Sequence, residues 1–313
     1  MIHDKKHGLW VVVALLWIEP ANARPADCTV VDLMPQYWQA LAATDPAAPL
    51  RATVIEPHPD LYNENYVSLP TGAAWNGKLA REKAYADAHR TEITAAEQYL
   101  ADNVPRYMNE FRRTFPDYRC DFTFYIAPSF GNMDGSAATV QGQHRILFAP
   151  DVIPRLHPLN KLKMLIDHET FHIYHHQATG VFGAEETAVP AIEAALWSEG
   201  LATFVSWRMN AGASLDEALL QPGIPAGARP HLAAMAAEWL AHLEERDEST
   251  YNRYFVGGKA PEGYPDRAGY YVGVLLAETF SKQYSLRQLA HLKGSKLHRA
   301  IVRELQEMQG SSN

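Results

Sequence analysis

Residues 165–176 read LIDHETFHIYHH and contain the pattern H-E-x-x-H. In a helix of 3.6 residues per turn, positions four apart share one face, so His168 and His172 would point to one place with Glu169 beside them. Two imidazoles at this spacing are typical of a metal clamp, and the carboxylate can accept a proton from a bound water. Apolar residues surround the motif on several sides, which predicts a helix buried in the core.

A second stretch supplies a candidate for the third ligand. Residues 194–203, AALWSEGLAT, predict another buried helix that carries a single carboxylate, Glu199. The glycine-containing segment 179–183 would separate the two helices, and Pro190 suits the first turn of the second one. Two antiparallel helices would bring this carboxylate onto the histidine pair, and Gly200 would let the helices approach closely.

The two motifs together resemble the gluzincin metallopeptidases. In that thermolysin-like class, zinc is held by two histidines and a downstream glutamate, here matched by H-E-x-x-H at 168–172 and E-G-x-A at 199–202. The form WSEGLAT at 197–203, with GYYVG at 269–273, is similar to a bacterial family of predicted zinc-dependent proteases of unknown substrate. The resemblance spans about residues 121–280. The interval before the glutamate is longer than in thermolysin, so the rest of that enzyme's substrate site is not carried over.

The resemblance implies a site and a fold. It implies zinc as cofactor, bound by His168, His172 and Glu199, with Glu169 as the general base. It also implies a zincin-like catalytic core of α+β, mostly helical class, with a small β-sheet and the two active-site helices packed together.

Three patterns predict how the chain is organised. Alternating aromatic and β-branched residues at 121–126 and an apolar run at 145–149 predict strands of a small sheet. The pattern over 75–115 is helical. We therefore expect a mainly helical N-terminal region, 24–120, packed as one compact unit with a catalytic region, 121–313.

The segment between the two predicted strands has two interpretations. Residues 131–142 are small, polar and bounded by glycines. In gluzincins an edge strand just before the zinc helix binds the substrate backbone, so residues 137–140 are a candidate for that strand by resemblance. The alternative is an ordinary hairpin loop.

A glycine-flanked stretch near the C-terminus carries further candidates. Peptide hydrolysis passes through an oxyanion, which gluzincins support with a Tyr or His donor. We expect one of Tyr270 and Tyr271 to take that role, with core packing as the alternative for either. Arg267 can bind a substrate carboxylate through two hydrogen bonds, but a salt bridge with Asp266 or another acid is the favoured interpretation.

Other polar residues near the motif are expected to act around the metal rather than on it. His175 and His176 lie one helical turn beyond the motif, too far along the axis to share one ion, and we assign them to supporting or surface roles. Asp167, Glu185 and Glu186 are candidate partners for the ligand imidazoles, and the sequence does not choose among them.

The N-terminus predicts export. Residues 1–23 combine Lys5 and Lys6, an apolar run at 9–18 and an A-x-A end, which is the pattern of a secretory signal peptide. The run is too short to span a membrane. We expect cleavage after Ala23 and a periplasmic or secreted protein, with a buried or membrane-anchoring helix as the alternative.

The cysteine pair bears on the same question. Cys28 and Cys120 are the only cysteines. In an oxidising compartment they can pair, which is our prediction, whereas two free thiols are the alternative. Their spacing does not suit a cysteine-type zinc site.

Composition limits the partners. Against 28 basic residues stand 36 acidic ones, a net charge of −8, and no basic run is present. This balance does not suit nucleic acid or anionic lipid, so we expect a peptide or protein substrate and no stable membrane insertion.

These patterns lead to one function and two alternatives. The leading hypothesis is an exported zinc metallopeptidase. The alternatives are a zinc hydrolase that acts on another carbonyl compound and a non-catalytic protein with structural zinc. Glu169 favours catalysis, because a structural site needs no base and would normally complete the coordination with a fourth protein ligand.

Overall fold

The structure is a computed structural model that describes residues 28–140, 142–180 and 191–310. These residues are mostly helical and include one four-stranded sheet, which confirms the expected α+β, mostly helical class. The signal peptide predicted at 1–23 lies outside the described residues. No helix in the described ranges is both long and apolar enough to cross a membrane.

The sheet has three parallel strands and an antiparallel edge. The predicted strands at 121–126 and 145–149 lie side by side at its centre, as β2 and β4. The first strand, β1, was not predicted, and it pairs in parallel with β2 on one side. The order is β1-β2-β4-β3, with bounds Thr29–Asp32 for β1, Thr123–Ile126 for β2, Gly135–Val140 for β3 and Gln143–Phe148 for β4.

Short helices and two long ones surround the sheet in the first half of the chain. The helical pattern predicted over 75–115 forms the two long helices, α3 and α4. Helix α4 contacts both β2 and α6, so it backs the sheet and the predicted metal helix. The bounds are Met34–Leu41 (α1), Ala47–Leu50 (α2), Arg51–Ile55 (a π-helical turn), Gly72–Ala88 (α3), Arg90–Thr114 (α4), Ile153–Leu156 (α5) and Leu159–Lys161 (a 3-10 turn).

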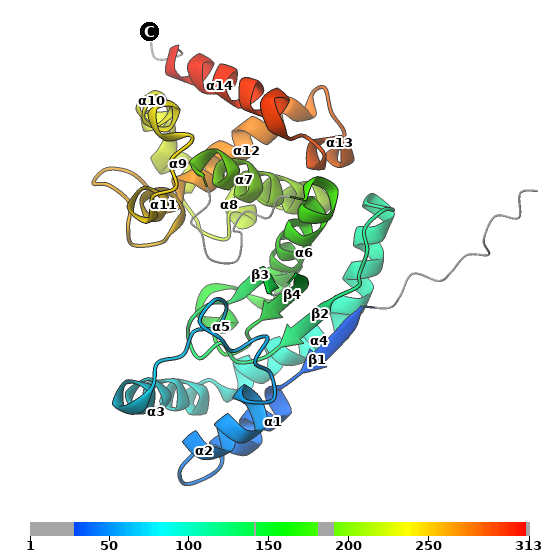
Figure 1. Cartoon of the computed structure of the whole chain (residues 1–313), viewed down its shortest axis with the longest axis vertical. Helices are drawn as coiled ribbons and strands as arrows, with labels where there is room; N and C mark the ends of the chain where they lie inside the picture. The colour runs from blue at the N-terminus through cyan, green and yellow to red at the C-terminus, as the bar shows by residue number, and fades with distance from the viewer. Residues whose placement is uncertain (1–27, 141, 181–190, 311–313) are drawn as a thin grey trace, which may run out of the picture.

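The second half of the chain is helical throughout its described part. Figure 1 shows α7 to α14 gathered at one end of the molecule, the sheet and α1 to α5 at the other, and α6 between them. The bounds are Leu162–Thr179 (α6), Ile192–Met209 (α7), Leu215–Ala218 (α8), Ile224–Ala228 (α9), Arg229–His231 (a 3-10 turn), Leu232–His242 (α10), Glu248–Phe255 (α11), Ala268–Ser281 (α12), Leu286–Ala290 (α13) and Gly294–Gly310 (α14).

Helices α6 and α7 are the two buried helices predicted from the sequence. Helix α6 ends at Gly180, whose φ of 71° is the left-handed conformation expected at a helix C-terminus. Gly200 permits a close helix approach as expected, but to α12 rather than α6. A Cβ on Gly200 would lie 2.2 Å from the backbone of Gly273, so these two helices touch through their backbones.

A disulfide joins Cys28 to Cys120, with their Cα atoms 5.1 Å apart, and confirms the predicted bond. Each cysteine lies just before one of the paired strands β1 and β2. The bond therefore fixes the start of the parallel pair.

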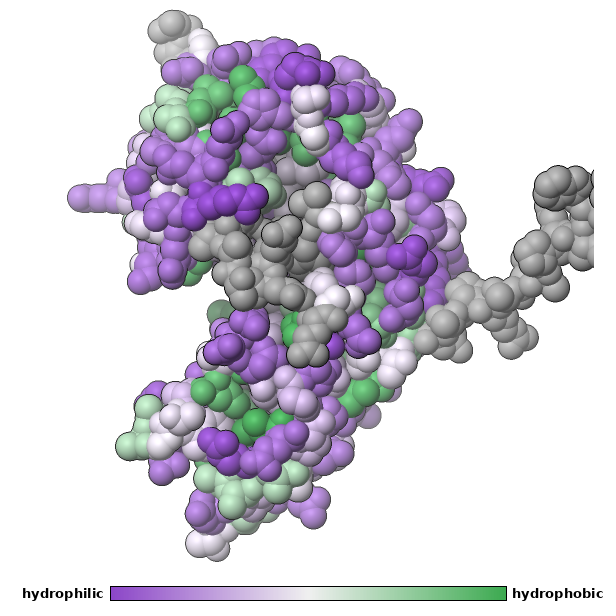
Figure 2. Space-filling view, viewed as in Figure 1, coloured by the Kyte–Doolittle hydropathy of each residue, from purple (hydrophilic) through white to green (hydrophobic). Residues whose placement is uncertain are grey.

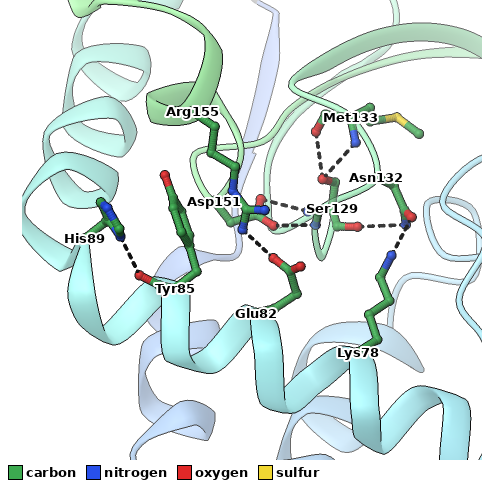
Figure 3. Close-up of polar contacts among 10 residues, drawn as sticks. Lys78, Glu82, Tyr85, His89, Ser129, Asn132, Met133, Asp151 and Arg155 are labelled. Carbon is green, nitrogen blue, oxygen red and sulfur yellow. Dashed lines mark hydrogen bonds and ion pairs between the residues drawn. The ribbon is translucent and has the colours of Figure 1, made fainter. Parts of the chain in front are cut away.

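A polar network anchors the loop that leads into β3 (Figure 3). The buried Asp151 carboxylate accepts hydrogen bonds from the backbone N–H groups of Ser129, at 2.9 Å, and Gly131, at 3.1 Å. Arg155 follows on α5 and forms an ion pair of 2.5 Å with Glu82 of α3. The edge strand thus starts from a loop held on two sides.

Hydrophilic residues predominate on the face shown in Figure 2. Among the described residues, the large apolar side chains that are exposed are Leu156 and Leu159. Leu156 lines the cleft that is described below.

Candidate metal centre

Three side chains from α6 and α7 converge on one point. The Nε2 atoms of His168 and His172 lie 3.0 Å apart, and each is 3.4 Å from an Oε atom of Glu199. The histidines share one face of α6 because they are four residues apart, and α7 packs across that face. In the described part of the chain this is the one group of three such side chains that could hold a metal ion.

The spacing of these atoms fits a small divalent cation. Ligand atoms around a tetrahedral ion with bonds of about 2.0 to 2.1 Å are about 3.3 Å apart. The separations of 3.0 and 3.4 Å in this group match that value. The three side chains are 7%, 12% and 19% exposed, so the point is shielded but can be reached from solvent.

Without an ion, the charge of each side chain in the group depends on the charges of its neighbours. Burial opposes ionisation of Glu199, but His172 and His168 outweigh it and hold the pKa of the carboxyl well below its usual range. Burial also disfavours a charged His172, yet Glu199, followed by Glu169, raises the pKa of this imidazole to about 9. A metal ion would therefore have to displace a proton from His172.

Glu169 lies beside the group and is not part of it. Its side chain lines the same cleft, and it is buried. Burial raises its pKa, against the opposing effect of His168 and His172. Gly135 of β3 packs on it, because a Cβ there would lie 3.4 Å from the Glu169 Cγ atom. A buried carboxylate with a raised pKa suits a general base.

Ser198 was not predicted and is the residue that contacts a ligand imidazole from behind. Its Oγ atom lies 3.3 Å from Nδ1 of His172. This contact orients the ring and leaves Nε2 directed at the other two ligand atoms. The signal in the sequence was its position directly before Glu199 on the same helix.

Of the three carboxylates predicted as partners of the imidazoles, the structure describes Asp167, and it has another role. Asp167 instead accepts hydrogen bonds from Lys163, at 2.6 Å, and Asn210, at 2.7 Å. It faces away because it precedes the first ligand by one residue, a rotation of about 100° on the helix. Glu185 and Glu186 lie outside the described residues.

The two histidines after the motif lie outside the ligand group. His175 is buried and stacks on Phe171, with ring centroids 5.8 Å apart, and burial lowers its pKa to about 3. His176 places Nδ1 at 3.2 Å from Nε2 of His144 on β4. Their roles are therefore packing and a contact between α6 and the sheet.

The structure distinguishes the two candidate tyrosines. Tyr270 lines the cleft, and its ring is nearly parallel to that of His168, with centroids 6.3 Å apart. Burial, followed by Glu199, raises its pKa well above 10, so it keeps its proton as a donor. Tyr271 is buried in the core, where its hydroxyl lies 3.4 Å from Nε of Arg229. Consecutive residues on a helix point about 100° apart, so only one faces the metal ligands.

Arg267 also lines the cleft, and the salt bridge expected for it is not formed within the described residues. Its neighbour Asp266 accepts a hydrogen bond of 3.1 Å from the backbone N–H of Ala260. The carboxylate is therefore used to close the loop before α12. The salt bridge with Asp266 that the sequence favoured for Arg267 is therefore not formed.

The ligand group opens into a cleft of about 910 Å³ that is bordered by both halves of the molecule. One side is the edge strand β3, which is also the first arm of the β3–β4 hairpin. The Ala149 N–H group donates to the Asp134 carbonyl, so these two residues form a hydrogen-bonded pair. Hydrogen-bonded and non-hydrogen-bonded pairs alternate along an antiparallel ladder. The N–H and C=O groups of Gly135, Ala137 and Thr139 therefore point away from β4. The other side comes from α7, α11 and the start of α12.

Comparisons with known proteins give no relative from which the chemistry of this cleft could be inferred. No protein-family model, curated protein or solved structure matches the chain. The likeness to gluzincins thus rests on the two short motifs in the sequence.

Proposed function

We propose that the protein is a zinc-dependent metallopeptidase. The observation that carries the proposal is the convergence of His168, His172 and Glu199 at tetrahedral spacing, with Glu169 beside them but outside the ligand group. Two imidazoles and one carboxylate are a donor set of catalytic zinc sites, in which the fourth position is left for water.

Each residue of the cleft would have a separate role in peptide hydrolysis. Zinc, when bound, makes a water more acidic and polarises the substrate carbonyl. Glu169 accepts the proton of the attacking water and passes it to the leaving nitrogen. Tyr270 donates a hydrogen bond to the oxygen on which charge develops. Ser198 keeps the His172 ring in position.

The edge strand supports a peptide substrate over another carbonyl compound. The N–H and C=O groups that β3 directs away from β4 can pair with an extended peptide, as an added strand. Gly135 and Ala137 of this strand line the cleft with the ligand group. Against a structural zinc site, no fourth described side chain joins the three ligands.

We also propose export to the periplasm or the cell exterior. The disulfide supports this part, because such bonds persist in oxidising compartments. The signal-peptide pattern in residues 1–23 supports it independently.

Zinc content and turnover, measured on the same variants, test the proposal. The wild type should carry close to one zinc per chain by elemental analysis, and His172→Ala should lose it. Glu169→Gln keeps the shape and removes the base, so it should retain zinc while peptide turnover falls by about 10²-fold or more. If Glu169→Gln stays active with zinc bound, the proposed mechanism is wrong.

The tyrosine pair supplies a matched control. Tyr270→Phe removes the proposed oxyanion donor and should lower turnover by about 10²-fold. Tyr271→Phe makes the same chemical change at the buried neighbour and should alter turnover little. Equal effects of the two substitutions would count against an oxyanion role for Tyr270.

A further inference from the structure

We propose that Arg267 binds a carboxylate of the substrate, one or two residues from the bond that is cleaved. The inference rests on the proposed peptidase function and narrows its substrate class. The carboxylate would be either the C-terminus of a peptide or an acidic side chain near the cleaved bond.

The first argument is the charge of the cleft. Arg267 is half-buried and forms no ion pair with any carboxylate of the described residues. The other arginine of the cleft, Arg155, is neutralised by Glu82 at 2.5 Å. The cleft carboxylate Asp134 is bound to His157. Glu199 and Asp134 act on this guanidinium only through their charge, without direct contact. A half-buried guanidinium that no described carboxylate contacts directly still has its donors available for an incoming carboxylate.

The second argument is that the guanidinium is held in place. Its central carbon lies 4.1 Å from the centroid of the Tyr270 ring, a cation–π contact. The backbone of Arg267 has φ 59°, a left-handed conformation that is unfavourable for a residue with a side chain. Such strain persists where the surroundings enforce it and is concentrated at binding sites. A fixed guanidinium fork matches the two oxygens of a carboxylate.

The third argument is distance. The centroid of the Tyr270 ring lies 4.1 Å from the central carbon of the guanidinium and 6.3 Å from the centroid of the His168 ring. The guanidinium is therefore within roughly 10 Å of a metal ligand, and an extended peptide advances about 3.5 Å per residue. A substrate cleaved at the ligand group would bring a carboxylate to Arg267 after one or two residues.

Three peptides that share one scissile bond test the assignment. The first ends in a free carboxylate two residues beyond the bond, the second is its C-terminal amide, and the third is an amide with Asp as the last residue. For the wild type, kcat/KM should be about 10- to 10²-fold higher for the first peptide than for the second, the scale of a charged hydrogen bond. High kcat/KM for the third peptide as well would identify an acidic side chain as an equivalent source.

Variants assign the preference to this residue. Arg267→Gln should reduce the ratio of kcat/KM between the first and second peptides to about one. Arg267→Lys keeps the charge but lacks the planar guanidinium, so its ratio should lie between those of the wild type and Arg267→Gln. Arg253→Gln is the matched control, since Arg253 also lies over a tyrosine ring, 5.6 Å from the Tyr254 centroid, but outside the cleft. It should keep the wild-type ratio.

A binding measurement separates this inference from the peptidase proposal. Calorimetric titration of N-acetylphenylalanine and of its amide needs no turnover, and the acid should bind the wild type about 10-fold or more tightly than the amide, but not Arg267→Gln. If no peptide is cleaved and this difference is found, the peptidase proposal fails and the carboxylate site stands. If the wild type shows no difference in titration or turnover, or Arg267→Gln keeps it, the assignment of Arg267 is overturned.

Discussion

His172 is the residue at which metal and proton compete. Because Glu199 and Glu169 raise its pKa to about 9 despite burial, it is charged at pH 7 in the metal-free protein. Metal binding at pH 7 should therefore release about one proton, and apparent affinity should fall about tenfold for each pH unit below 9. Above pH 9 the imidazole is already neutral, so the release should vanish.

Calorimetry of metal binding in buffers with different heats of ionisation measures this release. Glu199→Gln, compared with the wild type by NMR titration of His172 in the absence of metal, is the informative control, since it removes the carboxylate that raises the pKa of His172 and should lower that pKa. Metal binding without proton release in the wild type at pH 7 would contradict the coupling.

At the residue scale the sequence predicted which candidate ligands converge but not the contacts that hold them. His168, His172 and Glu199 follow from helical spacing and motif, which survive any detail of packing. The choice between Tyr270 and Tyr271 depends on the rotation of α12 about its axis, which its packing against neighbouring helices, chiefly α7, fixes. Asp266 accepts a hydrogen bond from Ala260 because of the path of the loop between them, and the local sequence pattern does not show that path.

Strand β3 allows a test at the scale of one element. Ala137→Pro removes an N–H that points away from β4, so the hairpin should persist while pairing with an extended substrate is lost. We expect kcat/KM for a peptide to fall by about 10-fold or more, with zinc content unchanged. Thr139→Pro changes an equivalent outward position that does not line the cleft, and should have little effect on peptide turnover. Equal losses in both variants would mean that the edge does not bind substrate.

The contact between α7 and α12 allows a second test at the scale of single elements. Gly200→Ala would place a Cβ 2.2 Å from the Gly273 backbone, which cannot move aside as a flexible side chain does. We expect destabilisation of about 2 to 3 kcal/mol or more, and a fall in melting temperature of about 5 °C or more. Gly77→Ala in α3 is the control, because its nearest neighbour is the end of the Arg81 side chain at 3.8 Å, and it should melt no lower than the wild type. An unchanged melting temperature for Gly200→Ala would refute the contact.

Elements were predictable where the local pattern was distinct. The buried helices α6 and α7, the helical stretch that forms α3 and α4, and the two central strands all follow from such patterns. Strand β1 is as short as β2 but has no aromatic residue and no clear alternation, and its partner begins more than ninety residues later, so nothing local marks it. For the same reason the sequence suggested that Gly200 faces α6, when its neighbour is a helix far along the chain.

The disulfide gives a prediction for the whole molecule. It closes a loop of 92 residues, so replacing both cysteines by serine should lower the free energy of unfolding by about 2 to 5 kcal/mol. Urea unfolding of the two proteins measures the difference. Alkylation of the native protein without reductant, followed by mass spectrometry, should label neither Cys28 nor Cys120. Two labelled thiols would rule the bond out.

The composition of the cleft was the least predictable feature at this scale. It is formed by residues near 131–137 and 152–157 on one side and by residues near 195–199 and 251–270 on the other. The ligands share it with Arg267 because α6 and α7 pack together and α12 packs on α7. Short motifs identify the candidate ligands, but only the assembled fold shows which residues lie opposite them in the cleft.

The parallel pair of β1 and β2 also bears on how fast the chain folds. Thr29 must find Thr123 before β1 can join the sheet, and closing so long a loop slows the search. A denatured chain that keeps its disulfide has already made that closure, because Cys28 and Cys120 border the two strands. The bond should then accelerate refolding, with oxidised chains reaching the native state sooner than reduced ones under the same conditions.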